Sequence, residues 1–107
     1  MDILEKLDKL LEDRKSSTAE DSYVKKLYDG GLEEILKKIK EESEELIEAA
    51  SKIQEGRGHK IIHETADLWF HTMVLLSKEG VSSAKVLEEL EIRFGKSGLE
   101  EKANRDK

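Results

Sequence analysis

Acidic residues interrupt the apolar face of a helical segment over residues 35–53, and this interruption constrains the fold more than any other feature. Apolar residues recur there at helical spacing, at Ile35, Ile39, Leu46, Ala49 and Ile53. At about 100° per residue, Glu42 points within this apolar stripe, and Glu45 and Glu41 lie about 60° and 100° further round, at one edge of it. A carboxylate that faces a core destabilises the fold by several kcal/mol unless a partner compensates it. Glu42 therefore needs a compensating group.

A second segment, from His63 to His71, also places acids among apolar residues. Its Glu64 and Asp67 are three residues apart and share one helical face. If the two helices run antiparallel, five carboxylates converge between them: Glu41, Glu42, Glu45, Glu64 and Asp67. A shared divalent cation would compensate them, and oxygen ligands select Mg²⁺ first and Mn²⁺ second, whereas zinc and copper favour imidazole or thiolate. Because Mg²⁺ prefers phosphate oxygens at its open positions, we expect a phosphorylated ligand.

Several of these residues also have a simpler interpretation. Glutamate-rich helices usually expose their carboxylates to solvent and pair them with lysines. Lys38 points near Glu42 and Glu45, so it either forms an ion pair within the helix or contacts a phosphate. His71 shares the acidic face, but a lone histidine on a buried helix is more often a hydrogen-bonded core residue than a ligand. Four nearby apolar residues are expected in the core or at a dimer interface: Trp69, Phe70, Met73 and Leu76.

The chain is predicted to be an all-α bundle of four to five helices that forms a single domain over residues 1–107. Helices are expected over about residues 2–13, 22–28, 32–54 and 59–78, and from Ser82 or Ser83 through Leu90, with breaks at Gly30-Gly31 and at residues 56–58. The helix over residues 59–78 is apolar around most of its circumference, which predicts a central position. The charged, glycine-containing residues 96–107 are expected to form a flexible tail.

Composition excludes several classes of function. The 25 acidic residues outnumber the 19 lysines and arginines, and the net charge of −6 argues against a nonspecific nucleic-acid or membrane-surface binder. The chain contains no cysteine, which excludes thiolate catalysis and thiolate-bound zinc. Its longest apolar run is far short of the roughly 20 residues that cross a bilayer. A soluble cytoplasmic protein is therefore expected.

The acidic residues also resemble a known signature. Glu41, Glu42 and Glu45, followed by Glu64 and Asp67, resemble the EExxE…ExxD pattern of the all-α, MazG-like nucleotide pyrophosphohydrolases. The flanking segments narrow the resemblance to the phosphoribosyl-ATP pyrophosphohydrolase family, through Ser22-Tyr23-Val24, Ala66-Asp67-Leu68 with His71, and the C-terminal run from Ser97 to Arg105. The C-terminal run is the more specific part. The chain departs from the pattern at residues 18–21, where a proline is expected, and at Phe70, where tyrosine is common.

This resemblance implies a hydrolase that converts 1-(5-phosphoribosyl)-ATP to 1-(5-phosphoribosyl)-AMP and pyrophosphate, in the second step of histidine biosynthesis. It implies Mg²⁺, with Mn²⁺ as a substitute, held by Glu42, Glu45, Glu64 and Asp67. Glu41 joins Glu42 and Glu45 as a catalytic residue, in the same shell or orienting the attacking water. Lys38, Lys102 and Arg105 are the expected phosphate contacts. Two chains would complete the bundle as a homodimer.

Two other functions fit less well. A house-cleaning pyrophosphohydrolase of the MazG and dUTPase-like branch would use the same acids on ordinary or aberrant nucleotides, but it has no need of the C-terminal run. A helical interaction module would explain the heptad spacing, yet it would leave Glu42 and Glu64 among apolar neighbours without compensation.

Overall fold

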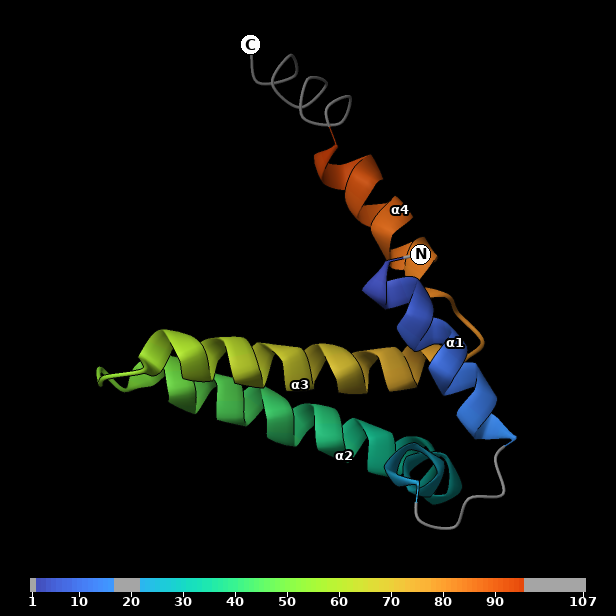
Figure 1. Cartoon of the computed structure of the whole chain (residues 1–107), viewed down its shortest axis with the longest axis horizontal. Coiled ribbons are helices and arrows are strands. Elements are labelled where there is room, and N and C mark those ends of the chain that lie inside the picture. Colours follow the sequence, from blue (N-terminus) through green and yellow to red (C-terminus); the bar gives the residue numbers. More distant parts are fainter. Residues whose placement is uncertain (1, 17–21, 96–107) are drawn as a thin grey trace.

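The structure, a computed structural model, describes residues 2–16 and 22–95, and this part of the chain consists of four helices and no strand (Figure 1). The helices are α1 (Ile3–Lys15), α2 (Tyr23–Ser51), α3 (Arg57–Lys78) and α4 (Ser83–Phe94). The prediction of an all-α fold is thereby confirmed. None of the described helices is both long enough and apolar enough to cross a membrane. The expected C-terminal tail, with Lys102 and Arg105, lies outside the described residues.

Helices α2 and α3 form a long antiparallel pair, which is the main packing unit of the chain (Figure 1). Gly56, with a φ of 78°, precedes the first turn of α3, and the Arg57 guanidinium donates two hydrogen bonds to the Ala50 carbonyl. These contacts end α2 at Ser51 and start α3 at Arg57, so the predicted boundaries at residues 54 and 59 were wrong by two or three residues. Ile53 falls in the connection and is 98% exposed, so it does not belong to the apolar stripe.

A kink at Gly31 divides α2 into two parts. Its φ of 77° and ψ of −172° lie outside the helical region, where a glycine has no side-chain penalty. The first turns of α2 are therefore seen nearly end-on in Figure 1, while the rest of the helix lies across the view. The predicted break at Gly30-Gly31 is confirmed as a sharp change of direction. It folds residues 23–30 back against the other helices.

The core lies where α1 and the first part of α2 meet the α2–α3 pair. Its buried residues form one cluster of Leu11, Val24, Leu27, Ile35, Met73 and Val74. The hydroxyl oxygen of Tyr28 lies 3.2 Å from the Leu11 carbonyl and 2.8 Å from the Ser77 hydroxyl, within hydrogen-bond distance of both, which links three helices. The small size of this cluster leaves much apolar surface of the chain uncovered.

A second hydrogen-bonded contact, between Tyr23 and His71, joins the start of α2 to α3. His71 Nδ1 lies 2.7 Å from the Asp67 carbonyl, which can only accept, so Nδ1 carries the proton. In the neutral ring Nε2 is then an acceptor, and the Tyr23 hydroxyl donates to it at 2.7 Å. Burial raises the pKa of Tyr23 above its ordinary value of 10.0, which keeps this donor protonated. The histidine is buried and satisfied on both ring nitrogens, as expected for a core residue.

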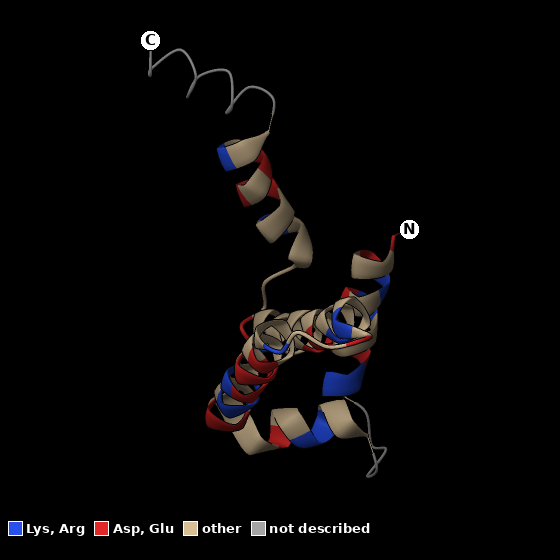
Figure 2. Ribbon diagram, turned by 90° about the vertical axis from the view of Figure 1, so that its left-hand side faces the viewer, with Lys and Arg blue, Asp and Glu red and all other residues tan. Residues whose placement is uncertain are grey.

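Helix α4 projects away from the α2–α3 pair, and its N-terminal end is anchored to α1 (Figure 2). Ser82 caps α4, as predicted, and the Asp8 carboxylate of α1 accepts hydrogen bonds from the amide and hydroxyl of Ser83. The radius of gyration is 17.1 Å, against about 13 Å expected for a compact domain of this length. The chain is therefore an open structure.

This openness bears on the prediction that the helix over residues 59–78 is central in a bundle that two chains complete. Within one chain, α3 packs against α2 along its length and against α1 near its C-terminal end. Its opposite side is uncovered, with Ile62 69% exposed and Trp69 61% exposed. The apolar circumference of α3 thus exceeds what one chain covers.

Removing the Tyr23 hydroxyl tests the tie to His71. Tyr23→Phe keeps the ring beside Phe70, with ring centroids 6.4 Å apart, but leaves His71 Nε2 buried without its donor. We expect the free energy of unfolding to fall by about 1–3 kcal/mol, measured by urea denaturation. Ser51→Ala, which removes an exposed hydroxyl bond to the Ile47 carbonyl, should change it by less than about 0.5 kcal/mol. Equal unfolding midpoints for Tyr23→Phe and the wild type would contradict this role.

Candidate metal centre

The antiparallel α2–α3 pair brings carboxylates from both helices together. One oxygen each from Glu42, Glu45 and Glu64 lies within 4.8 Å of the other two. Glu42 is only 8% exposed, Glu64 is half-buried, and Glu45 lies at the exposed edge. This position follows from the helical period, which puts Glu42 within the apolar stripe that packs on α3. Three of the four predicted metal ligands thus meet between the two helices.

Asp67, the fourth predicted ligand, lies in a second group that overlaps the first. One ligand atom each from His63, Glu64 and Asp67 also lies within 4.8 Å of the other two. His63 Nε2 is 3.4 Å from Asp67 Oδ2, across one turn of α3. Sequence reasoning assigned His63 no role, although its place four residues before Asp67 puts both side chains on one face of the helix.

The buried oxygens of this site fit a divalent cation. Glu42 Oε2 and Glu64 Oε2 are both inaccessible to solvent, and neither has a hydrogen-bond partner among the described residues. Buried carboxylate oxygens without donors are strongly unfavourable unless a positive charge reaches them. An all-oxygen set such as Glu42, Glu45 and Glu64 suits Mg²⁺ or Mn²⁺. The residues present therefore fit the metal that the sequence predicts.

The electrostatics of the cluster agree with this fit. Burial raises the pKa of Glu42 above its ordinary value of 4.5, and the neighbouring carboxylates of Glu45 and Asp67 raise it further. Burial likewise raises the pKa of Glu64, and Glu45 again adds to the effect. Without a cation, the folded chain resists ionisation of both groups because their negative charges are desolvated and repel one another.

Glu41 and Lys38 pair with each other. Lys38 Nζ lies 3.2 Å from Glu41 Oε2, one turn apart on α2, and both side chains are partly exposed. The hydrogen bond to Glu41 raises the pKa of Lys38 above its ordinary value. The structure thus leaves Glu41 outside the two groups of potential ligands, and it places Lys38 in an ion pair within the helix, although with Glu41 and not with the Glu42 or Glu45 that the sequence pointed to.

Comparison with known proteins identifies the family. A sequence model described as phosphoribosyl-ATP pyrophosphohydrolase matches residues 4–94, which include all four helices apart from the first residue of α1. The chain belongs to the phosphoribosyl-ATP pyrophosphohydrolase family. The matched region contains Glu41, Glu42, Glu45, Glu64 and Asp67. The resemblance found in the sequence is therefore confirmed.

Individual members of the phosphoribosyl-ATP pyrophosphohydrolase family match nearly the whole chain. A protein of Hydrogenovibrio crunogenus named phosphoribosyl-ATP pyrophosphatase is 50% identical over 107 residues, covering 99% of this chain and 95% of the relative. A protein of the same name from Vesicomyosocius okutanii is 53% identical, with 98% of this chain and 97% of the relative covered. Another from Methylococcus capsulatus is 50% identical with the same coverage.

The raised pKa values predict how pH affects the metal-free chain. A carboxyl whose folded-state pKa is raised stabilises the fold below its unfolded value of 4.5, and this contribution is lost as the pH rises through the folded-state pKa. In EDTA we expect the wild type to lose thermal stability as the pH rises from about 4.5 to 7.5. Glu42→Gln should lose less and should melt a few degrees above the wild type at the higher pH.

The comparison is made by thermal melts of both proteins and of Glu44→Gln, whose exposed side chain lies on another side of α2. The Glu44→Gln melts should follow the wild type. Saturating Mg²⁺ should raise the melting temperature of the wild type more than that of Glu42→Gln, because one ligand has lost its charge. A Glu42→Gln protein that melts below the wild type in EDTA would show that Glu42 is not an uncompensated charge.

Proposed function

We propose that this chain hydrolyses 1-(5-phosphoribosyl)-ATP to 1-(5-phosphoribosyl)-AMP and pyrophosphate, with Mg²⁺ and in the cytoplasm, as the second step of histidine biosynthesis. The observation that carries the proposal is the pair of buried, unpartnered oxygens of Glu42 and Glu64, two residues of α2 and α3 whose carboxylates belong to one group of potential ligands. They occur in a chain whose relatives bear the name phosphoribosyl-ATP pyrophosphatase. A structural helix pair has no use for such groups, whereas a phosphate-binding cation site does.

Glu42, Glu45, Glu64 and Asp67 would hold the cation in this reaction. A bound Mg²⁺ would polarise a phosphoryl oxygen and lower the pKa of a bound water. The anhydride bond between the first two phosphates breaks as the water oxygen bonds to one phosphorus and the bridging oxygen leaves on the other. Glu41 is proposed to orient the water and take its proton, because it adjoins the buried Glu42 on α2 and lies one turn before Glu45.

The three proposed phosphate contacts, Lys38, Lys102 and Arg105, rest on different observations. Lys38 is engaged with Glu41, so it would reach a phosphate only by sharing or leaving that pair. Lys102 and Arg105 are proposed on their match to the C-terminal run of the family, and both lie outside the described residues.

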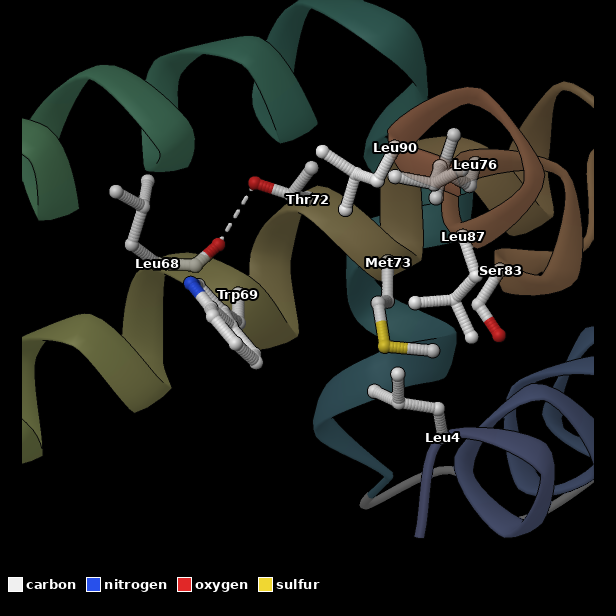
Figure 3. A pocket seen from close by; sticks show the side chains of 10 residues that line it. Leu4, Leu68, Trp69, Thr72, Met73, Leu76, Ser83, Leu87 and Leu90 are labelled. Atoms are coloured by element: carbon white, nitrogen blue, oxygen red, sulfur yellow. Dashed lines mark hydrogen bonds between the residues drawn. The ribbon is translucent and has the colours of Figure 1, made fainter. Parts of the chain in front are cut away.

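We further propose that two chains form a homodimer through an apolar groove between α1, α3 and α4 (Figure 3). The groove has a volume of about 440 Å³, and Figure 3 shows Met73 of α3 close to Leu87 of α4 and Leu4 of α1, with Trp69 further along α3. Such a groove in a soluble chain of net charge −6 needs a covering surface. A second copy of the chain supplies one, because the projecting α4 and the uncovered side of α3 are apolar too.

The dimer is tested with matched charges on α4. Leu90→Glu places a carboxylate in the groove and should shift the protein to the mass of a single chain, as measured by light scattering after gel filtration. Ile92→Glu changes an exposed residue of the same helix that does not line the groove, and it should stay dimeric. A wild type that elutes as a monomer, or a Leu90→Glu variant that remains dimeric, would contradict the proposed interface.

The activity is tested by pyrophosphate release from phosphoribosyl-ATP, with ATP, dUTP and dCTP as competing substrates. We expect release from phosphoribosyl-ATP that requires Mg²⁺ and stops in EDTA. Glu42→Gln should lower kcat/KM by more than about 100-fold, since it removes a ligand charge, whereas Glu44→Gln should match the wild type. Release from an ordinary nucleotide in preference would assign the chain to the house-cleaning enzymes. Release from none would contradict both assignments.

A further inference from the structure

His63 changes the chemistry of the overlapping ligand groups on α3. The first group, Glu42, Glu45 and Glu64, offers only oxygen atoms. The second group, His63, Glu64 and Asp67, offers one imidazole nitrogen with two carboxylates. The two groups share Glu64, and Asp67 is also one of the proposed Mg²⁺ ligands, so the two candidate cation positions overlap. The signature shared with the family accounts for the carboxylates but not for the histidine.

The surroundings of the second group suit an ion that arrives from solution. The His63 side chain is 69% exposed and that of Asp67 is 42% exposed, so both can be reached. Glu64, by contrast, keeps Oε2 buried without a partner, and it lies beside the buried Glu42, whose Oε2 is also unpartnered. The group is therefore open to solvent at His63 and Asp67, whereas at Glu64 Oε2 it is buried and has no hydrogen-bond partner among the described residues.

We propose that His63, Glu64 and Asp67 form a cation position that binds a transition-metal ion such as Zn²⁺ or Mn²⁺ in preference to Mg²⁺. Imidazole nitrogen favours zinc and other first-row transition metals, whereas Mg²⁺ prefers oxygen ligands and is poorly served by nitrogen. The all-oxygen group on its other side keeps the preference for Mg²⁺. The inference rests on the proposed metal site, because Glu64 belongs to both groups, but it does not depend on the substrate.

A simpler arrangement would be an ion pair between a protonated His63 and Asp67, which are 3.4 Å apart. The two arrangements differ in their response to metal. A coordinating His63 must give up the proton on the ligating nitrogen, so its ring nitrogen resonance changes when Zn²⁺ is added. An ion pair alone leaves that resonance unaffected by substoichiometric Zn²⁺.

The test measures Zn²⁺ binding by calorimetry on the intact chain without substrate, in the wild type, His63→Ala and His59→Ala. His59 is the matched control, because it is an exposed histidine one turn earlier on α3 that belongs to neither ligand group. We expect His63→Ala to weaken Zn²⁺ binding by at least about tenfold and His59→Ala to leave it unchanged. The Mg²⁺-induced rise in melting temperature should persist in both variants.

Nitrogen-15 spectra of the wild-type histidine rings supply the second readout. A shift of the His63 ring nitrogen with Zn²⁺, absent with Mg²⁺, would support the proposal. Equal Zn²⁺ affinity in His63→Ala and the wild type, or a loss in His59→Ala that matches the loss in His63→Ala, would overturn it. These outcomes are separate from those of the pyrophosphate assay, because a chain that hydrolyses phosphoribosyl-ATP with Mg²⁺ can still lack this second position.

Discussion

Burial of Glu42 between α2 and α3 is the constraint on which the site depends. The same helical stripe that packs α2 on α3 carries this carboxylate into the contact, and Glu64 meets it from the opposite helix. Apolar packing therefore holds like charges together that would separate in an isolated chain. The repulsion and desolvation weaken the metal-free fold, and a bound cation would convert both into favourable interactions. The carboxylates that would bind the cation therefore destabilise the fold when no cation is present, a trade-off that is common at functional sites.

Two hydrogen-bonded ties hold the rest of the chain around this helix pair. The kink at Gly31 turns the start of α2 back, where Tyr23 bonds His71 and Tyr28 bonds Ser77. His71 follows Asp67 by one turn and donates to its backbone carbonyl, so the tie lies directly beside the acidic face of α3. Positioning of the site and packing of the core therefore share one network. Helix α4, in contrast, is anchored mainly through Asp8, and an apolar groove lies between it, α1 and α3.

Several expectations failed for identifiable physical reasons. Ile53 continued the heptad pattern in the sequence, but Arg57 caps the end of α2 earlier and leaves Ile53 in the connection. The spacing of apolar residues does not show that the Arg57 guanidinium bonds the Ala50 carbonyl near the end of the preceding helix. The central position expected of α3, which is apolar all round, is a separate case: one chain covers only part of the helix, so that position would need a second chain. The pattern reports how much surface must be buried, without reporting which molecule buries it.

The sequence by itself determined the all-α class, the kink at Gly31, the family and the five acids, because each follows from local spacing or from a contiguous motif. The tertiary structure decided how those acids divide. It brought Glu42 and Glu45 of α2 against Glu64 of α3, whereas the pairs Lys38–Glu41 and His63–Asp67 each lie within one helix. A helical period fixes the direction of a side chain around its own axis, but the distance to a side chain on another helix depends on how the two helices pack.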